Sequence, residues 1–120
     1  MPTYTPGQIA EKTGFSLDTL RYYERIGLLD EVERTPGGQR VYGDDDVSWL
    51  SILRCLRDTG MPIARMRQYA ELSRDEQTTA ERLALLEEHD REVGRRIDTL
   101  REQREHIRAK IGYYRSLDPD

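Results

Sequence analysis

Residues 5–26 read TPGQIAEKTGFSLDTLRYYERI, and this segment carries the clearest folding signals of the N-terminal part of the chain. Thr5 followed by proline predicts a helix start, with a side-chain cap and a proline in the first turn. Gly14 is expected to end that helix, and Ser16 to cap a second helix that another glycine closes. Two short helices joined by a tight glycine turn, with an aliphatic anchor at Leu20, are typical of a helix-turn-helix.

The second helix, residues 17–26, has two faces when its side chains are placed at helical spacing. Its packing side is formed by Leu17, Leu20 and Tyr23. Its opposite face carries polar and aromatic side chains that can contact DNA: Asp18, Thr19, Tyr22 and Arg25. Arg21 lies between the two faces, where its stem can pack and its guanidinium can reach a phosphate. A solvated charged face is the alternative, but the position directly after the turn of a helix-turn-helix favours DNA contact.

Residues 30–42 predict a β-hairpin, because a proline-glycine-glycine turn precedes an alternating strand. In that strand Val41 is expected to point inward, which places Arg40 and Tyr42 together on the outer face. A guanidinium and a phenol suit a DNA backbone, so the hairpin is interpreted as a wing. A surface hairpin without a ligand is the alternative.

Residues 44–57 begin with a run of aspartates and continue with apolar side chains on one side. This pattern predicts a third helix, with Trp49 in the core. A break that contains glycine and proline precedes a fourth helix at residues 63–74, on which Ile63 is expected to face inward. The two helices form a second pair and complete a predicted DNA-binding domain at residues 1–74.

Residues 79–114 show a heptad rhythm of apolar side chains, which is typical of a helix that pairs with another helix. The apolar seam consists of Leu83, Leu86, Val93, Ile97, Leu100, Ile107, Ile111 and Tyr114. Asp90 and Arg104 occupy the remaining seam positions, nearly equidistant from Ile97. An antiparallel pair centred there would bring opposite charges together, whereas a parallel pair would stack like charges. Residues 75–120 are therefore predicted to form a dimerisation region, as an antiparallel coiled coil.

The predicted elements make a mainly α fold, and the composition favours the pairing of that fold with a second chain. Of 120 residues, 36% are hydrophobic and 35% are charged, which leaves little apolar surface to bury within one chain. The net charge is −4, but nearly all of the 19 basic residues are arginines, which suit phosphate and guanine. No apolar run is long enough to cross a membrane and no secretory signal is present, so a cytoplasmic location is expected.

Several segments, taken in order, resemble the MerR family of bacterial transcription regulators: YTPGQIA at 4–10, TLRYYE at 19–24, GLL at 27–29, RVY at 40–42 and LRDTGM at 56–61. The resemblance covers essentially the whole chain. Each segment alone is a weak signal, but all of them in this order are highly specific.

The resemblance implies a homodimer that binds double-stranded promoter DNA at a pseudo-palindromic site with a long spacer. In this family the activated state underwinds and bends the spacer so that RNA polymerase can engage both promoter elements, which is a form of indirect readout. Position by position, the resemblance implies DNA contacts by Thr19, Arg21, Tyr22, Arg40 and Tyr42. It implies contacts to the DNA backbone by Ser16, Arg25 and Arg54.

The resemblance also bears on what is sensed. The metal-sensing branch has cysteines near the ends of the long helix, and the drug-sensing branch has a large C-terminal ligand-binding domain, but this chain has neither. His89 and His106 lie nearly symmetrically about Ile97, yet two histidines make a poor metal site. No metal and no cofactor are therefore expected.

Cys55 is the single cysteine. It is similar to the lone cysteine of the NmlR/AdhR subgroup, which responds to aldehydes and other electrophiles or to oxidative and nitrosative stress. Helical spacing places it at the edge of the apolar side of the third helix, where a small reagent can reach it. One alternative is a small buried hydrophobic residue. Another is a MerR-type regulator that responds to a non-covalent small ligand.

Two further classes of function compete with a regulator. A coiled-coil adaptor that never binds DNA would leave the arginine-rich helix and the wing without a role. A cysteine enzyme would need a catalytic partner, and neither histidine is expected near Cys55. The predicted class is therefore a DNA-binding regulator without enzymatic activity.

Overall fold

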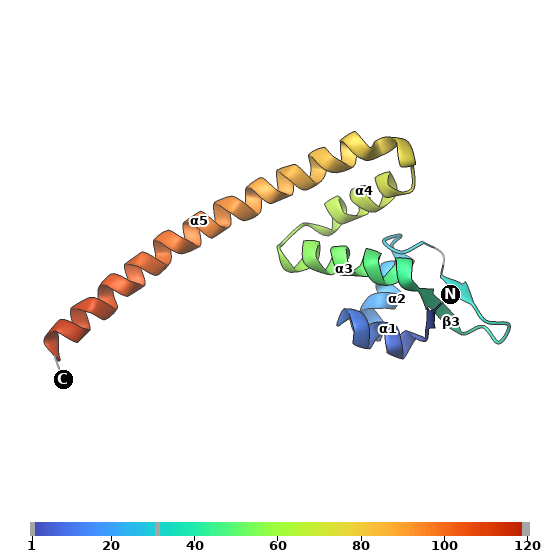
Figure 1. Ribbon diagram of the computed structural model, residues 1–120, viewed down its shortest axis with the longest axis horizontal. Coiled ribbons are helices and arrows are strands. Elements are labelled where there is room, and N and C mark those ends of the chain that lie inside the picture. Colours follow the sequence, from blue (N-terminus) through green and yellow to red (C-terminus); the bar gives the residue numbers. More distant parts are fainter. Residues whose placement is uncertain (1, 31, 119–120) are drawn as a thin grey trace. The chain divides into compact units, whose positions relative to one another are not determined.

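The computed structural model describes residues 2–30 and 32–118 (Figure 1). Residues 1, 31 and 119–120, which belong to the predicted DNA-binding and dimerisation regions, lie outside the described residues. The chain divides into two units, Met1–Arg82 and Leu83–Asp120. The first unit therefore extends past residue 74, through a short 3-10 helix and into the first turn of the long helix.

The first unit contains short strands and mostly short helices. In chain order these are β1 (Thr3–Tyr4), α1 (Pro6–Thr13), α2 (Leu17–Arg25), β2 (Glu33–Arg34), β3 (Arg40–Gly43), α3 (Asp44–Asp58), α4 (Ile63–Ser73) and the 3-10 helix η1 (Glu76–Thr78). The predicted helix-turn-helix, wing and second helical pair are all present. The mainly α fold class is confirmed.

Side-chain caps begin both helices of the helix-turn-helix, as the sequence predicts. At the start of α1, the Thr5 hydroxyl accepts from the Gln8 backbone N–H and the Gln8 side chain accepts from the Thr5 N–H, which is a capping box. Gly14 follows α1 with a φ of 79°, a left-handed conformation that favours glycine. Ser16 caps α2 by accepting from the Thr19 N–H.

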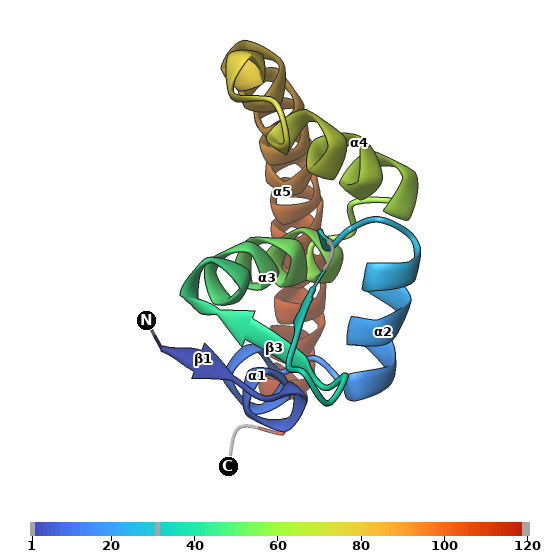
Figure 2. The same ribbon diagram turned by 90° about the vertical axis from the view of Figure 1, so that its right-hand side faces the viewer.

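The sheet has three strands in the order β1-β3-β2, with both pairs antiparallel. Thr3 lies opposite Gly43, and Glu33 lies opposite Val41. Figure 2 shows β1 beside β3, which leads into α3. The sequence pattern predicts only the hairpin. Strand β1 was missed because two residues carry no alternating pattern, and the strand exists through its pairing with β3.

The core of the first unit takes side chains from α1, α2, β3, α3 and α4 and from the segment after α2. Its fully buried side chains include Ile9, Leu20, Leu28, Tyr42, Leu50, Leu53 and Met66. Leu17 and Ile63 were expected to pack inward, but they are 40% and 41% exposed. Each is the first residue of its helix, and we attribute its exposure to that position at the end of the element.

Trp49 is half-buried rather than central to the core. Its indole N–H donates to the Leu28 carbonyl at 2.7 Å, and its ring stacks on Tyr69 with centroids 5.4 Å apart. The tryptophan therefore joins α3 both to α4 and to the segment that follows α2. A polar edge with one partner and an apolar face with another is a common arrangement for tryptophan.

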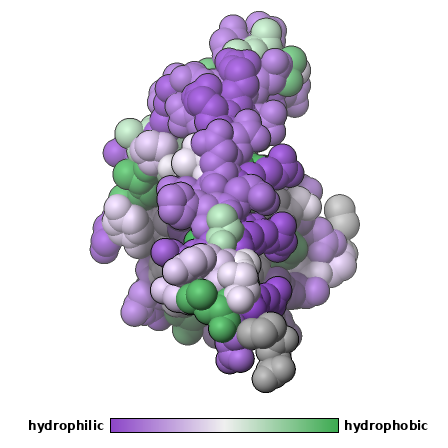
Figure 3. Space-filling view, turned by 90° about the vertical axis from the view of Figure 1, so that its left-hand side faces the viewer, coloured by the Kyte–Doolittle hydropathy of each residue, from purple (hydrophilic) through white to green (hydrophobic). Residues whose placement is uncertain are grey.

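The long helix α5 spans Thr79–Leu117, which confirms the predicted long C-terminal helix and extends it by three residues past 114. Its 39 residues give a length of about 58 Å at 1.5 Å per residue. Much of the predicted seam is exposed in the single chain, including Leu83, Ile97, Leu100, Ile107, Ile111 and Tyr114. The face shown in Figure 3 is mostly hydrophilic, with hydrophobic side chains in small patches. Within the described residues, no helix combines the length and the apolar character needed to cross a membrane.

Candidate nucleic-acid interface

The outer face of α2 presents basic and aromatic side chains to solvent. Tyr22 is 41% exposed, and the Arg25 guanidinium lies 5.5 Å from the centre of its ring. Arg21 forms an ion pair with Asp18 at 3.6 Å, and both side chains are largely exposed. An ion pair in water contributes little to stability, so a phosphate can replace the carboxylate at low cost. These positions agree with the face that helical spacing predicts.

Ser16 and Thr19 form the N-terminal edge of this face. The Ser16 hydroxyl donates to Thr19 Oγ1 at 2.9 Å and accepts from the Thr19 N–H at 3.1 Å. The two hydroxyls therefore hold each other and fix the start of α2. The positive end of the α2 dipole lies at the same place and favours a phosphate.

The wing is tied to α2 through a single carboxylate. Glu24 Oε2 accepts from Arg40 Nε at 2.6 Å, and Glu24 Oε1 lies 3.5 Å from Arg34 Nη2. The Glu24 side chain is only 17% exposed and the Arg40 side chain is 28% exposed. Sequence reasoning predicted Arg40 as a surface contact but missed Glu24 and Arg34, because their pairing depends on how the hairpin folds back onto α2.

Tyr42 is not on the outer face of the wing, and the prediction that placed it there is wrong. Its side chain is 1% exposed, whereas Val41 is half-buried. Burial raises the pKa of the Tyr42 phenol, and the negative charge of Glu24 raises it further. Strand β3 is the central strand and packs on α1 and α3, so the larger aromatic side chain fills the core. A phenol buried in this way is not available to contact DNA.

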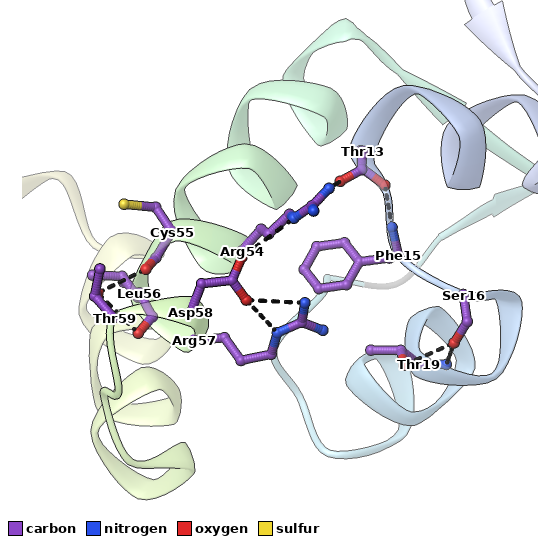
Figure 4. Close-up of polar contacts among 10 residues, drawn as sticks. All are labelled: Thr13, Phe15, Ser16, Thr19, Arg54, Cys55, Leu56, Arg57, Asp58 and Thr59. Atoms are coloured by element: carbon purple, nitrogen blue, oxygen red, sulfur yellow. Dashed lines mark hydrogen bonds and ion pairs between the residues drawn. The ribbon is translucent and has the colours of Figure 1, made fainter. Parts of the chain in front are cut away.

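Arg54 contacts the turn of the helix-turn-helix (Figure 4). Its Nη1 donates to the Thr13 carbonyl at 2.7 Å, and its Nε lies 3.4 Å from Asp58 Oδ2. The Arg57 guanidinium lies 4.8 Å from the centre of the Phe15 ring. Sequence reasoning predicted Arg54 as a contact to the DNA backbone and missed Arg57. Their spacing on one helix was the available signal, but it does not identify a partner 41 residues away.

Cys55 lies on the same turn of α3 and is exposed in the single chain. In the single chain this exposure does not fit the alternative of a small buried residue. Figure 4 shows its sulfur pointing away from Arg54 and Arg57. The Cys55 carbonyl accepts from the Thr59 hydroxyl at 2.7 Å, which helps to close the C-terminal end of α3.

His89 and His106, which the sequence places nearly symmetrically about Ile97, lie on α5. Among the residues that the structure describes, no group of three or more His, Cys, Asp or Glu side chains is placed to hold a metal ion.

Comparison with known proteins identifies the family. Residues 4–73 match the family described as MerR HTH family regulatory protein, and residues 47–110 match the one described as MerR, DNA binding. The chain belongs to the MerR family. It is a DNA-binding transcription regulator of the MerR type, as the sequence motifs predict.

Individual relatives place this MerR regulator in an NmlR/AdhR-like subgroup. An HTH-type transcriptional regulator of Haemophilus influenzae is 38% identical over 113 residues, which cover 93% of this chain and 84% of the relative. AdhR of Bacillus subtilis is 36% identical over 74 residues, but these cover 62% of this chain and 53% of AdhR.

Two solved structures share the fold over nearly the whole chain. HiNmlR, a MerR family regulator lacking the sensor domain and solved bound to promoter DNA, is 37% identical with a TM-score of 0.86, covering 96% of this chain and 92% of HiNmlR. A MerR family regulator from Listeria monocytogenes is 36% identical with a TM-score of 0.87, covering 92% of this chain and 85% of that protein.

Proposed function

We propose that this MerR regulator binds a pseudo-palindromic promoter as a homodimer and distorts the spacer so that RNA polymerase engages both promoter elements. The observation that carries the proposal is the outer face of α2. It presents Tyr22, Arg21 and Arg25 to solvent on a helix that the wing holds through Glu24. The likeness to HiNmlR, which was solved with promoter DNA, supports the same surface as the one that meets the duplex.

The contacts divide into two kinds. Thr19, Arg21 and Tyr22 lie where a helix in the major groove meets base edges, and a base-reading role is assigned to them. Ser16 and Arg25 flank that face and contact phosphates, and Arg40 does so through the part of its guanidinium that Glu24 leaves exposed. Together they set the register of the protein on the duplex.

The dimer rests on α5. A single helix of 39 residues with an exposed apolar seam is costly in water, and a second copy of the helix covers that seam. Asp90 and Arg104 interrupt the seam on either side of Ile97, which favours an antiparallel pair. The α2 helices of the two chains then contact two half-sites that are related by a two-fold axis.

The test is a gel-shift titration on duplexes that the wild-type protein selects from a random library. Arg21→Ala is expected to weaken binding to the selected duplex about tenfold and to relax the preference for the base pair that Arg21 reads. Arg95→Ala is the matched control, because Arg95 forms the same kind of exposed pair with Glu92 at 3.6 Å, but on α5. Failure to select any sequence, even at low salt, would favour the coiled-coil adaptor.

We also propose that Cys55 senses electrophiles. Its thiol is exposed on the last turns of α3, so a small carbonyl compound can reach it. In the reaction with an aldehyde the thiolate adds to the carbonyl carbon, a C–S bond forms, and the oxygen takes up the proton to give a hemithioacetal. The added group would shift the balance between two DNA-bound arrangements of the dimer.

Run-off transcription with an aldehyde or a quinone tests this second proposal. The wild-type protein is expected to change transcription from the selected promoter, and Cys55→Ser to lose at least most of that change while it binds the same duplex. A full response by Cys55→Ser would exclude Cys55 as the sensor and would favour a regulator that responds to a non-covalent small ligand.

A further inference from the structure

Two arginines of α3 reach the turn between α1 and α2 from one side (Figure 4). Arg54 donates to the Thr13 carbonyl at 2.7 Å, and Arg57 covers the ring of Phe15 at 4.8 Å. Arg54 thereby supplies a donor to a carbonyl at the end of α1, while Arg57 rests on the residue that precedes the cap of α2. The last turns of α3 thus contact both halves of the turn.

The turn itself is tightly determined. Gly14 leaves room for Arg54, because a Cβ at that position would lie 1.6 Å from Nη1. The Thr13 hydroxyl donates to the Ile9 carbonyl at 2.7 Å. Phe15 is 2% exposed and meets Tyr23 edge-on, with ring centres 5.3 Å apart. A displacement of the turn would therefore move the start of α2 with it.

One carboxylate holds both arginines. Asp58 Oδ2 lies 3.4 Å from Arg54 Nε, and Asp58 Oδ1 lies 3.1 Å from both Arg57 Nε and Arg57 Nη2. Without that carboxylate two like charges on neighbouring turns would repel each other and turn toward solvent or toward a phosphate. Because the Asp58 side chain is 50% exposed, its effect is on the direction of the two guanidinium groups more than on overall stability.

We propose that Asp58 is a positioning residue for DNA recognition: by holding Arg54 and Arg57 on the turn Thr13–Phe15, it sets the place of the N-terminus of α2. The inference rests on the proposed function, because α2 must be the helix that reads the duplex. Asp58 itself contacts no DNA. It acts through the two arginines on Ser16 and Thr19, which form the start of the reading face.

The test compares Asp58→Asn with Glu71→Gln in the full-length protein. Each variant removes one negative charge, and each therefore strengthens non-specific phosphate binding to a similar extent. Glu71 is an exposed residue of α4 outside this network. The measurement is the ratio of affinities for a duplex selected by the wild-type protein and for a scrambled duplex. Asp58→Asn is expected to lower this ratio about tenfold, Glu71→Gln to change it less than twofold, and Asp58→Glu to recover most of it.

A second measurement requires no DNA. In the free protein, Asp58→Asn is expected to shift the amide resonances of Gly14, Phe15 and Ser16, whereas Glu71→Gln leaves them in place. Thermal unfolding shows whether both variants are folded. If Asp58→Asn does not fold, the affinity ratio and the amide resonances are measured on the conservative variant Asp58→Glu.

The inference is overturned if the two charge-removing variants give the same affinity ratio, whether or not the amide resonances move. It is also overturned if those resonances stay in place. If the wild-type protein selects no duplex at all, the proposed function fails. The amide resonances then decide separately whether Asp58 positions the turn.

Discussion

At the scale of single residues, Gly14 is needed for two reasons, its backbone conformation and the space that its missing side chain leaves for Arg54. Its φ of 79° is costly for any residue with a Cβ, and that Cβ would also overlap the Arg54 guanidinium. Gly14→Ala is expected to lower the free energy of unfolding by about 1–2 kcal/mol from backbone strain. The loss of the bond from Arg54 to Thr13 would add about 1 kcal/mol or more. Urea denaturation at a fixed protein concentration measures the sum.

Gly27→Ala is the matched control for this substitution. Gly27 has a φ of 87°, but a Cβ there would meet nothing within 4 Å. Gly27→Ala should therefore lower the free energy of unfolding by the backbone strain alone. An Arg54→Ala background should remove the difference between the two alanine variants, and an unchanged difference would contradict the packing argument.

Tyr42 gives the folded chain a dependence on alkaline pH. Because burial raises the pKa of its phenol, the neutral form is favoured in the folded state. The stability that follows is present below about pH 10 and is lost as the pH rises through the folded-state pKa, at up to about 1.4 kcal/mol per pH unit. The test is urea denaturation between about pH 8 and about pH 11, a range around the ordinary pKa of tyrosine. As the pH rises, Tyr42→Phe should lose less stability than the wild type.

Tyr113→Phe is the matched control, because it also removes one tyrosine hydroxyl, but from a side chain that is 54% exposed on α5. The same Tyr42→Phe protein should bind the selected duplex as the wild type does, since the phenol lies in the core. Weakened binding with unchanged stability would restore the DNA-contacting role that the sequence suggested.

At the scale of the elements, the link between α2 and the wing depends on Glu24. Replacing it with glutamine leaves Arg40 without a counter-charge in a half-buried place, at a distance of 2.6 Å from the altered group. Glu24→Gln is expected to lower the free energy of unfolding by about 1–2 kcal/mol, less than for a fully buried pair because water screens part of it. Thermal or urea unfolding measures this loss.

Asp18→Asn is the corresponding control on the same helix. Its ion pair with Arg21 is exposed, with the Asp18 side chain 96% accessible, so its removal should change stability by less than about 0.5 kcal/mol. Equal losses for the two variants would show that burial does not distinguish these pairs.

The elements also show how far local signals reach. Thr5 and Ser16 mark the starts of α1 and α2 where the sequence predicts them, because a cap involves residues only three positions apart. The face of α2 was also predictable, with Leu17 as the exception. The inward and outward faces of β3 were assigned the wrong way round, because a short strand with an aromatic residue on one face and valine on the other fits either orientation.

At the scale of the whole molecule, the charges within the α5 seam offer a test of the antiparallel dimer. Asp90→Arg is expected to weaken dimerisation at least tenfold, because it would place two positive charges together. The double variant Asp90→Arg with Arg104→Asp should restore dimerisation, since the opposite charges exchange places. Analytical ultracentrifugation over a range of concentrations measures both.

The direction of pairing has an independent readout. In an antiparallel dimer centred near Ile97, spin labels at position 83 of the two chains lie about 40 Å apart, whereas in a parallel dimer they lie side by side. Labels found adjacent would contradict the antiparallel arrangement without affecting the DNA-binding proposal.

The class of the protein and its main elements could be predicted from local sequence patterns. Helix caps, glycine turns and the heptad rhythm act through residues close together in the chain, and the ordered motifs of residues 4–61 were enough to predict the MerR family. The side chains that remain available to contact DNA depend instead on how the elements pack. In the folded chain Tyr42 is buried, Arg40 donates a hydrogen bond to Glu24, and Arg54 donates one to the turn before α2. The physical reason is that these contacts join residues far apart in sequence, so their partners are set by packing and not by local pattern.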